Sequence, residues 1–410
     1  MLTPEELKPH ILHQDRWIRI AALDRFTETW SLDPEIAALA LTAHERYFQL
    51  GEFPRLNGIH QLRIDAGTVK RILALLDTTP SRIVVIHINW CLASLPLDIL
   101  RMEGGRIDDH PRLNDEARQK IRYRRRIGDL SDEALWEEFL EFSGREKMKG
   151  VPHLVDPLTR PLVEELASRR MPDAEGVCAL IRSPAFRGTF FEDLLVQVAG
   201  VRRLKAAMPR LVAMLHPGDE DDDEVENVSC QEALVRIGHP HTVSMIRKRW
   251  WDLQRESAAC VLGQIPTPES EEALVQLFEE DDDPGVRFFI ADGLCQLFSR
   301  KAVPSVLCVL RQGAAYDEEA LREKLLPVID FFGIEIPEAG SWRKERQEKL
   351  AQSRSPEEPC PEALEIHKKI LGAMKELDRA DEMLAESYLE LGKHFAEPES
   401  EEEPGDPRET

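Results

Sequence analysis

Residues Asp283–Ala291 read DPGVRFFIA and residues Asp15–Leu23 read DRWIRIAAL, so one pattern occurs in two distant parts of the chain. In each stretch an acid precedes a β-branched residue and an arginine, and a short apolar run follows. An acid that can cap a helix, followed by apolar residues at helical spacing, is typical of a helix in a repeated helical pair. The pattern therefore predicts the architecture of the chain but not its activity.

Helix starts of one kind recur along the chain. A capping residue is followed by proline, which fits the first helical position because the N–H that it lacks has no partner there. Strand signals are nearly absent, since Arg82–Ile88 is the only β-branched cluster and can equally form one buried helix. The chain is predicted to be all-α. The capped proline starts are Thr3-Pro4, Asp33-Pro34, Thr79-Pro80, Thr267-Pro268 and Asp283-Pro284.

The helical periodicity is clearest between Val225 and Arg311. Apolar residues from Leu253 to Ile265 and from Ala273 to Phe278 form two stripes that must be buried by stacking against neighbours. When Arg255 is aligned with Arg287, the two surrounding sequences repeat each other. Such a repeat predicts a solenoid of antiparallel helix pairs.

The repeated pattern, Asp-x-x-Val-Arg-x-x-Ala-Ala-x-x-Leu-Gly followed by a second helix, resembles HEAT repeats, including the HEAT-like type of phycobilisome-lyase-related proteins. The resemblance implies an armadillo-like superhelix with an extended concave surface that most often binds proteins. In such repeats the arginine usually contacts an aspartate of an adjacent turn or repeat. The best matches are Asp283, Val286, Arg287, Ala291 and Leu294, then Arg255, Ala258, Ala259, Leu262 and Gly263, then Asp15, Ile18, Arg19, Ala21 and Ala22.

Shifts in composition divide the chain into six segments. A polar, basic stretch interrupts the helical pattern, and a proline-rich stretch without an apolar stripe follows the repeats. We expect N-terminal helical repeats at 1–100, a polar basic insertion or loop at 101–131, a HEAT-like repeat region at 132–335, a linker at 336–361, a heptad-patterned helix at 362–395 and an acidic disordered tail at 396–410.

The C-terminal segment 362–395 has apolar residues at alternating spacings of three and four, from Ala363 to Leu391. This heptad spacing is typical of a long helix with an apolar seam. Such a helix can pair with a second copy in a homodimer, fold back on the repeats or cap their end.

Composition and charge limit the classes of function. A net charge of −23 makes nucleic acid an unlikely partner, because a duplex binds clustered lysines and arginines. No apolar run is long enough to span a bilayer, and the N-terminus does not resemble a signal peptide, so we expect a cytoplasmic protein that does not bind membranes. The seven cysteines are scattered without C-x-x-C pairs, which favours buried reduced thiols.

Two groups of residues are candidates for binding a partner. Trp250 and Trp251 precede a helix, and an exposed tryptophan there would be an anchor, although core packing of both is favoured. The basic run in the polar segment could contact phosphate, but a helix face held against acidic neighbours is the preferred interpretation. The candidates in this run are Arg122, Tyr123, Arg124, Arg125 and Arg126.

No cluster in the sequence forms a complete metal or catalytic site. The acidic run 219–224 lacks the glycine and the final glutamate of an EF-hand loop. The pairs His10/His13 and His239/His241 would each need further ligands, and Asp108-Asp109-His110 has no nucleophile beside it. Phosphate-binding loops, dinucleotide fingerprints and nucleophile elbows are absent. We therefore expect no cofactor, no metal and no catalytic residue.

Three functions compete. The first is a non-enzymatic HEAT-repeat scaffold or adaptor that binds a protein partner along its concave face. The second is a bilin-lyase-like or other HEAT-fold enzyme, and the third is a HEAT-like protein that binds nucleic acid. The repeats, together with the missing reaction centre, favour the scaffold.

Overall fold

The computed structural model describes the chain except for residues 49–55, 57, 145–158, 217–224, 314–316 and 354–410. The described residues form α-helices joined by turns and short 3-10 helices, and no strand occurs among them. The predicted all-α class is therefore confirmed. The chain divides into two units, Met1–Trp342 and Arg343–Thr410.

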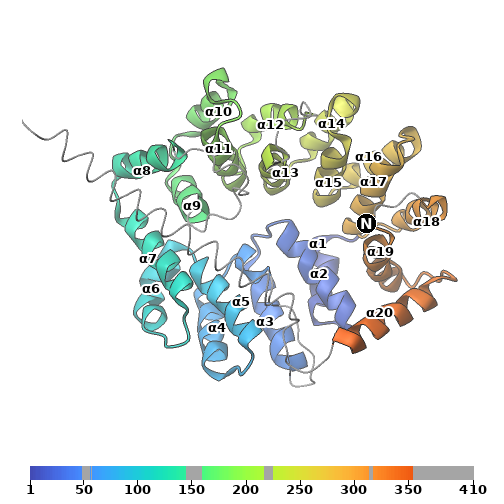
Figure 1. Cartoon of the computed structure of the whole chain (residues 1–410), viewed down its shortest axis with the longest axis horizontal. Helices are drawn as coiled ribbons and strands as arrows, with labels where there is room; N and C mark the ends of the chain where they lie inside the picture. Colours follow the sequence, from blue (N-terminus) through green and yellow to red (C-terminus); the bar gives the residue numbers. More distant parts are fainter. Residues whose placement is uncertain (49–55, 57, 145–158, 217–224, 314–316, 354–410) are drawn as a thin grey trace, which may run out of the picture. The chain divides into compact units, whose positions relative to one another are not determined.

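The first ten helices occupy the first part of the larger unit (Figure 1). They are α1 (Pro4–Leu7), α2 (Arg16–Glu28), α3 (Pro34–Phe48), α4 (Ala66–Thr78), α5 (Arg82–Ala93), α6 (Leu97–Asp108), α7 (Asp115–Asp129), α8 (Asp132–Gly144), α9 (Thr159–Arg169) and α10 (Ala174–Arg182).

The second ten continue to the start of the smaller unit. They are α11 (Phe190–Val201), α12 (Met208–Met214), α13 (Val225–Ile237), α14 (Pro240–Arg249), α15 (Arg255–Gln264), α16 (Pro268–Glu280), α17 (Pro284–Gln296), α18 (Ala302–Gln312), α19 (Glu318–Phe332) and α20 (Ala339–Ser353). None of the helices in the described part of the chain has the length and apolarity that a membrane span requires.

The two stretches that opened the sequence analysis begin helices. The side chain of Asp15 accepts hydrogen bonds from the backbone N–H groups of Trp17 and Ile18 at the start of α2. Asp283 does the same for Gly285 and Val286 at the start of α17. Each carboxylate satisfies donors that have no partner inside the helix, which fixes where the helix begins.

Alternate helices contact one another along the larger unit. α9, α11, α13, α15, α17 and α19 each pack on the next member of this series, and α12, α14 and α16 form a second series (Figure 1). Small residues allow close approach within the first series. A Cβ atom on Gly263 of α15 would lie 2.5 Å from the Cα of Gly293 in α17, so only glycine fits there.

A buried carboxylate joins neighbouring pairs. Asp281 is fully buried and accepts hydrogen bonds from Arg255 Nη1 and from Trp250 Nε1, each at 2.9 Å. Arg287 donates through Nε to the backbone carbonyl of Asp281 at 2.6 Å, so it contacts the aspartate through the main chain. A buried charge requires such partners because an unpaired one would destabilise the fold.

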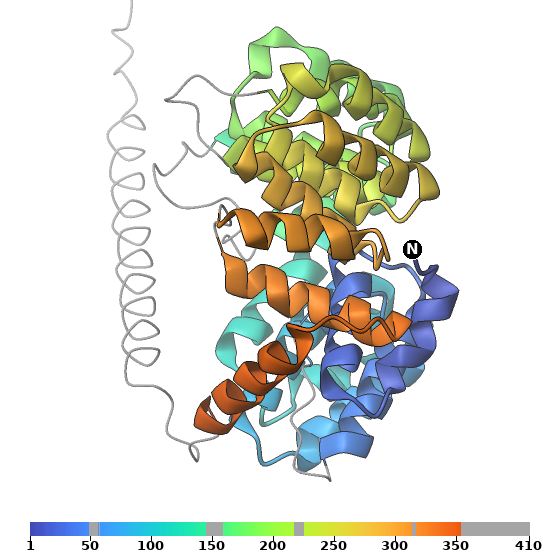
Figure 2. The same ribbon diagram turned by 90° about the vertical axis from the view of Figure 1, so that its right-hand side faces the viewer.

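The two ends of the larger unit meet. α2 packs on α19, and the views in Figures 1 and 2 agree on this arrangement. Arg25 of α2 is buried and donates through Nη1 to the carbonyl of Gly263 at 3.1 Å. The ring of His10 lies 4.4 Å from that of Phe331 in α19. Residues from the first thirty positions and from the last helices of this unit therefore share one core.

Two segments differ from the sequence prediction. Residues 101–131 were expected as an insertion or loop, but most of them lie in α6 and α7, which bury Ile107, Ile121 and Ile127 beneath an arginine-rich surface. The linker expected at 336–361 includes α20, which begins with the buried Ala339. In both segments a few well-spaced apolar residues form a helix despite polar composition. The segments 362–395 and 396–410 lie outside the described residues.

We predict that Gly263→Ala lowers the free energy of unfolding by about 1 to 3 kcal/mol, because its Cβ would overlap the backbone of α17. Gly105→Ala in α6 is the matched control, since no atom lies within 4 Å of its Cβ position. It should stabilise the protein by about 0.5 kcal/mol. Urea unfolding of both variants is the measurement, and equal effects would contradict the close packing of α15 on α17.

Candidate anion-binding pocket

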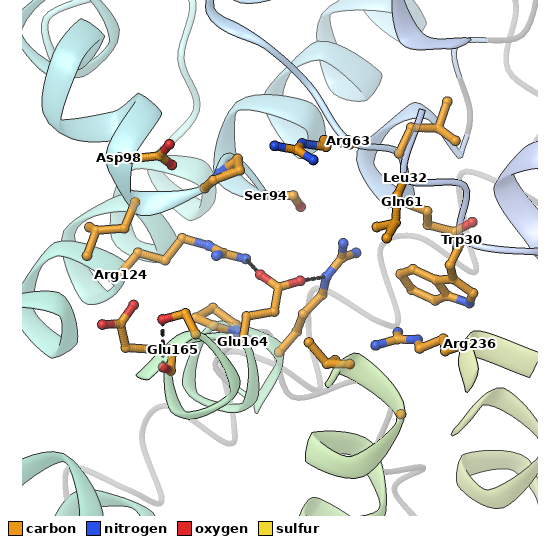
Figure 3. A pocket seen from close by; sticks show the side chains of 18 of the residues that line it. Trp30, Leu32, Gln61, Arg63, Ser94, Asp98, Arg124, Glu164, Glu165 and Arg236 are labelled. Atoms are coloured by element: carbon orange, nitrogen blue, oxygen red, sulfur yellow. Dashed lines mark hydrogen bonds and ion pairs between the residues drawn. The ribbon is translucent and has the colours of Figure 1, made fainter. Parts of the chain in front are cut away.

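The larger unit contains a pocket of about 510 Å³ (Figure 3). Its lining comes from segments that are distant in sequence, from Trp30 after α2 to Arg236 in the last turn of α13. Three acids line it, namely Asp98, Glu164 and Glu165, so its positive charges exceed its negative charges. The lining arginines are Arg63, Arg101, Arg124, Arg160, Arg203 and Arg236.

Trp30 is the residue around which one side of the pocket is built. The guanidinium of Arg236 lies 3.5 Å from the centre of its ring, and that of Arg160 lies 5.1 Å away. Arg203 donates through Nη2 to the carbonyl oxygen of Trp30 at 3.2 Å. Cation–π contacts of this kind contribute about 0.5 to 2 kcal/mol each. Trp30 thereby holds arginines from α9, α13 and the turn after α11 beside the N-terminal helices.

Glu164 forms the other side. Its carboxylate lies between two guanidinium groups, 2.8 Å from Arg124 Nη2 and 2.6 Å from Arg160 Nε (Figure 3). Burial alone would raise the pKa of Glu164, but the charges and hydrogen bonds of Arg124 and Arg160 lower it to about 2. This triad shows how the pocket holds a carboxylate, with one guanidinium on each oxygen.

Three of the lining arginines are less tightly paired than Arg124 and Arg160. Within the part of the chain that the structure describes, no acid lies within hydrogen-bond distance of Arg63 or Arg203. Arg236 Nη2 forms a longer ion pair with Glu232 of the same helix, at 3.6 Å. Burial lowers the pKa of Arg236 to about 10, and the charge of Arg160 acts in the same direction. These cations can accept an anion from outside the chain.

The basic run predicted from the sequence lies on α7, and only one member lines the pocket. Arg124 is buried and binds Glu164. Arg125 is bonded to Asp108, and Arg126 binds Glu138 through both Nη atoms. Tyr123 donates to Glu138 at 3.4 Å, and Arg122 is exposed outside the pocket. These contacts favour the interpretation of a helix face neutralised by acids of the same chain.

Trp250 and Trp251 have different environments. Trp250 is buried and donates to Asp281, whereas Trp251 is 63% exposed and lies beside Arg255. The preference for core packing of both rings is therefore wrong for Trp251. The indole N–H of Trp250 is a hydrogen-bond donor to the buried Asp281. Trp251, the next residue in the helical turn, points outward. Neither tryptophan lines the pocket.

The other clusters singled out in the sequence have structural partners. His110 Nε2 lies 3.0 Å from Asp77, and His239 caps the start of α14. Among the described residues, no group of three or more His, Cys, Asp or Glu side chains is arranged to hold a metal. Six cysteines are free thiols, and burial raises the pKa of Cys91 to about 12. The acidic run 219–224 and Cys360 lie outside the described residues.

Most of the residues that line this pocket belong to no motif in the sequence. Trp30, Arg160, Arg203 and Arg236 stand alone in their local sequence, without a motif around them. Their arrangement results from the packing of distant helices, because the contacts of Trp30 are with residues more than a hundred positions further along the chain. No spacing rule for one helix or loop could have indicated them.

Comparisons with known proteins give little further information. No protein-family model matches the chain, and no curated protein matches it. A solved engineered protein from the Northeast Structural Genomics Consortium is similar at 15% sequence identity, with a TM-score of 0.26. The match covers 80% of this chain and 99% of that one. A TM-score this low does not bear on fold or function.

We predict that Glu164→Gln lowers the free energy of unfolding by about 2 kcal/mol at pH 7, since it leaves the buried Arg124 without its carboxylate. The folded-state pKa of about 2 lies below the ordinary value of 4.5. The stabilisation is thus fully present above pH 4.5 and is lost as the pH falls toward 2.

Urea unfolding of the wild type and the variant between pH 3 and pH 7 measures this difference. Glu116→Gln is the control, because its pair with Lys120 is exposed and should contribute less than about 1 kcal/mol. A stability difference for Glu164→Gln that stays constant over this pH range would contradict the triad.

Proposed function

We propose that the larger unit is a HEAT-like α-solenoid and that the chain is a non-enzymatic scaffold. In this proposal an acidic segment of a protein partner enters the arginine-lined pocket. The series of alternate helices that pack one on the next, and the Asp–Arg contacts between pairs, support the solenoid. A cytoplasmic location fits the free cysteines of the described residues.

The observation that carries the proposal is local charge. The whole chain has a net charge of −23, yet its pocket is lined by twice as many arginines as acids. A recess lined by one sign of charge concentrates the field and attracts ligands of the opposite sign. An acidic ligand is therefore attracted to this recess although the whole chain is negatively charged.

A protein segment suits this pocket better than a nucleic acid. The volume of about 510 Å³ admits a few side chains, whereas a long polyanion would extend beyond it and interact with a chain whose net charge is −23. The basic run on α7, which the nucleic-acid alternative requires, is bonded to Asp108 and Glu138. No specific observation favours the enzymatic alternative.

We predict that Arg63→Gln weakens binding of an acidic segment by about three- to tenfold without loss of stability. Arg63 lines the pocket and is exposed, and no hydrogen bond or ion pair joins it to another residue within the described part of the chain. A single charge contact of this kind contributes about 1 kcal/mol. Fluorescence anisotropy with a labelled oligoglutamate peptide and the full chain gives the dissociation constant.

Arg122→Gln is the matched control, since Arg122 is an exposed arginine that does not line the pocket. It should bind the peptide like the wild type. The double variant R63Q/R203Q should also fail to recover acidic partner proteins from an extract of the source cells. Equal affinities for Arg63→Gln and Arg122→Gln, or equal recovery of partners, would contradict the proposal.

A further inference from the structure

The strongest unused feature of the fold is an apolar strip on α5. Ile83, Ile86 and Trp90 are 66%, 41% and 39% exposed. They stand at positions i, i+3 and i+7 of one helix, which places them on one face. Large apolar side chains that are exposed together on a helix face mark sites of interaction more often than those scattered singly.

The strip is not needed to hold α5 in place. The opposite face of the helix buries Val84, Ile88 and Leu92 in the core. Asn89 fixes the helix further, because its side chain donates to the carbonyl of Arg112 and accepts from the backbone N–H of Asn114. The residues that anchor α5 in the core are thus on the face opposite Ile83 and Ile86.

The strip is connected to the arginine pocket through His60. The ring of Trp90 lies 6.2 Å from that of His60. The carbonyl oxygen of His60 accepts a hydrogen bond from Arg160 Nη2 at 3.0 Å, and Arg160 lines the pocket. Burial lowers the pKa of His60 to about 4, and the charge of Arg160 adds to this effect, so the imidazole is neutral at pH 7. The Trp90 end of the strip therefore lies close to the Arg160 side of the pocket.

We propose that the α5 strip and the arginine pocket form one binding surface, and that its occupant is an amphipathic helical segment of a protein partner. The apolar side chains of this segment, at i, i+3 or i+4 and i+7, contact the strip, and its acidic residues enter the pocket. The inference rests on the proposed function and adds the chemistry of the partner.

Charge and spacing support this occupant. From Ile83 to Trp90 the strip extends over about 10 Å, or two helical turns, which matches the anchor spacing of a helix bound in a groove. Arginines at one end require carboxylates at the corresponding end of the ligand. A ligand that was only apolar would leave Arg63 and Arg203 without a carboxylate partner, and one that was only acidic would leave the strip in water.

The test uses the full chain and two fluorescein-labelled peptides in an anisotropy titration. The first is a helix-forming peptide of about 18 residues, with leucines at this spacing and glutamates in the turns at both ends. The second has the same composition in scrambled order, so that it keeps the acids but has no apolar stripe. Circular dichroism confirms that each protein variant is folded.

The strip variant is I83S/I86S. Its control is Leu140→Ser on α8, because Leu140 is 45% exposed and Ile86 is 41% exposed. We expect the striped peptide to bind the wild type more tightly than the scrambled one. I83S/I86S should raise the dissociation constant of the striped peptide about tenfold and leave that of the scrambled peptide unchanged. Leu140→Ser should change neither.

The results separate the two proposals. If I83S/I86S leaves the affinity for the striped peptide unchanged while R63Q/R203Q weakens both peptides, the inference about the strip is wrong and the proposed function stands. If R63Q/R203Q weakens neither peptide, the proposed function is wrong. If the strip instead joins two copies of this chain, I83S/I86S will dissociate an oligomer in sedimentation without changing peptide affinity, which would also overturn the inference.

Discussion

The stacking of Arg236 on Trp30, at 3.5 Å, is the contact on which the candidate site depends. It joins the last turn of α13 to the residue that follows α2, and the hydrogen bond from Arg203 to the Trp30 carbonyl fixes the same junction. α2 also packs on α19, so the first helices lie against later ones at a second place. Without this junction the arginines of the pocket would belong to separate surfaces.

The local elements could be predicted from the sequence, because local physical rules determine them. Asp15 and Asp283 cap helices where the motif placed them, and Pro268 begins α16 after the capping residue Thr267, as expected. Prediction failed where a helix is polar on most of its surface, as in α7, because its few buried isoleucines are outnumbered by arginines. The pocket could not be predicted from the sequence. The contacts of Trp30 with Arg160, Arg203 and Arg236 depend on which distant helices pack together.

Charge and apolar contact have separate roles in the proposed binding of a partner. The whole chain is negatively charged, while one recess is lined by six arginines and only three acids and so attracts anions. Complementary charge speeds the encounter with a partner and selects the right one, but it contributes less to affinity. Apolar anchor residues supply much of the binding free energy. The strip on α5 beside the pocket provides both in one place.

Hydrogen–deuterium exchange of the full chain, with and without a saturating acidic helical peptide, tests whether these distant segments form one binding surface. If distant segments form one surface, exchange should slow together in the residues around His60, in the first turn of α9 and in the last turn of α13. Slowing confined to α7, or to only one of these three segments, would contradict the account.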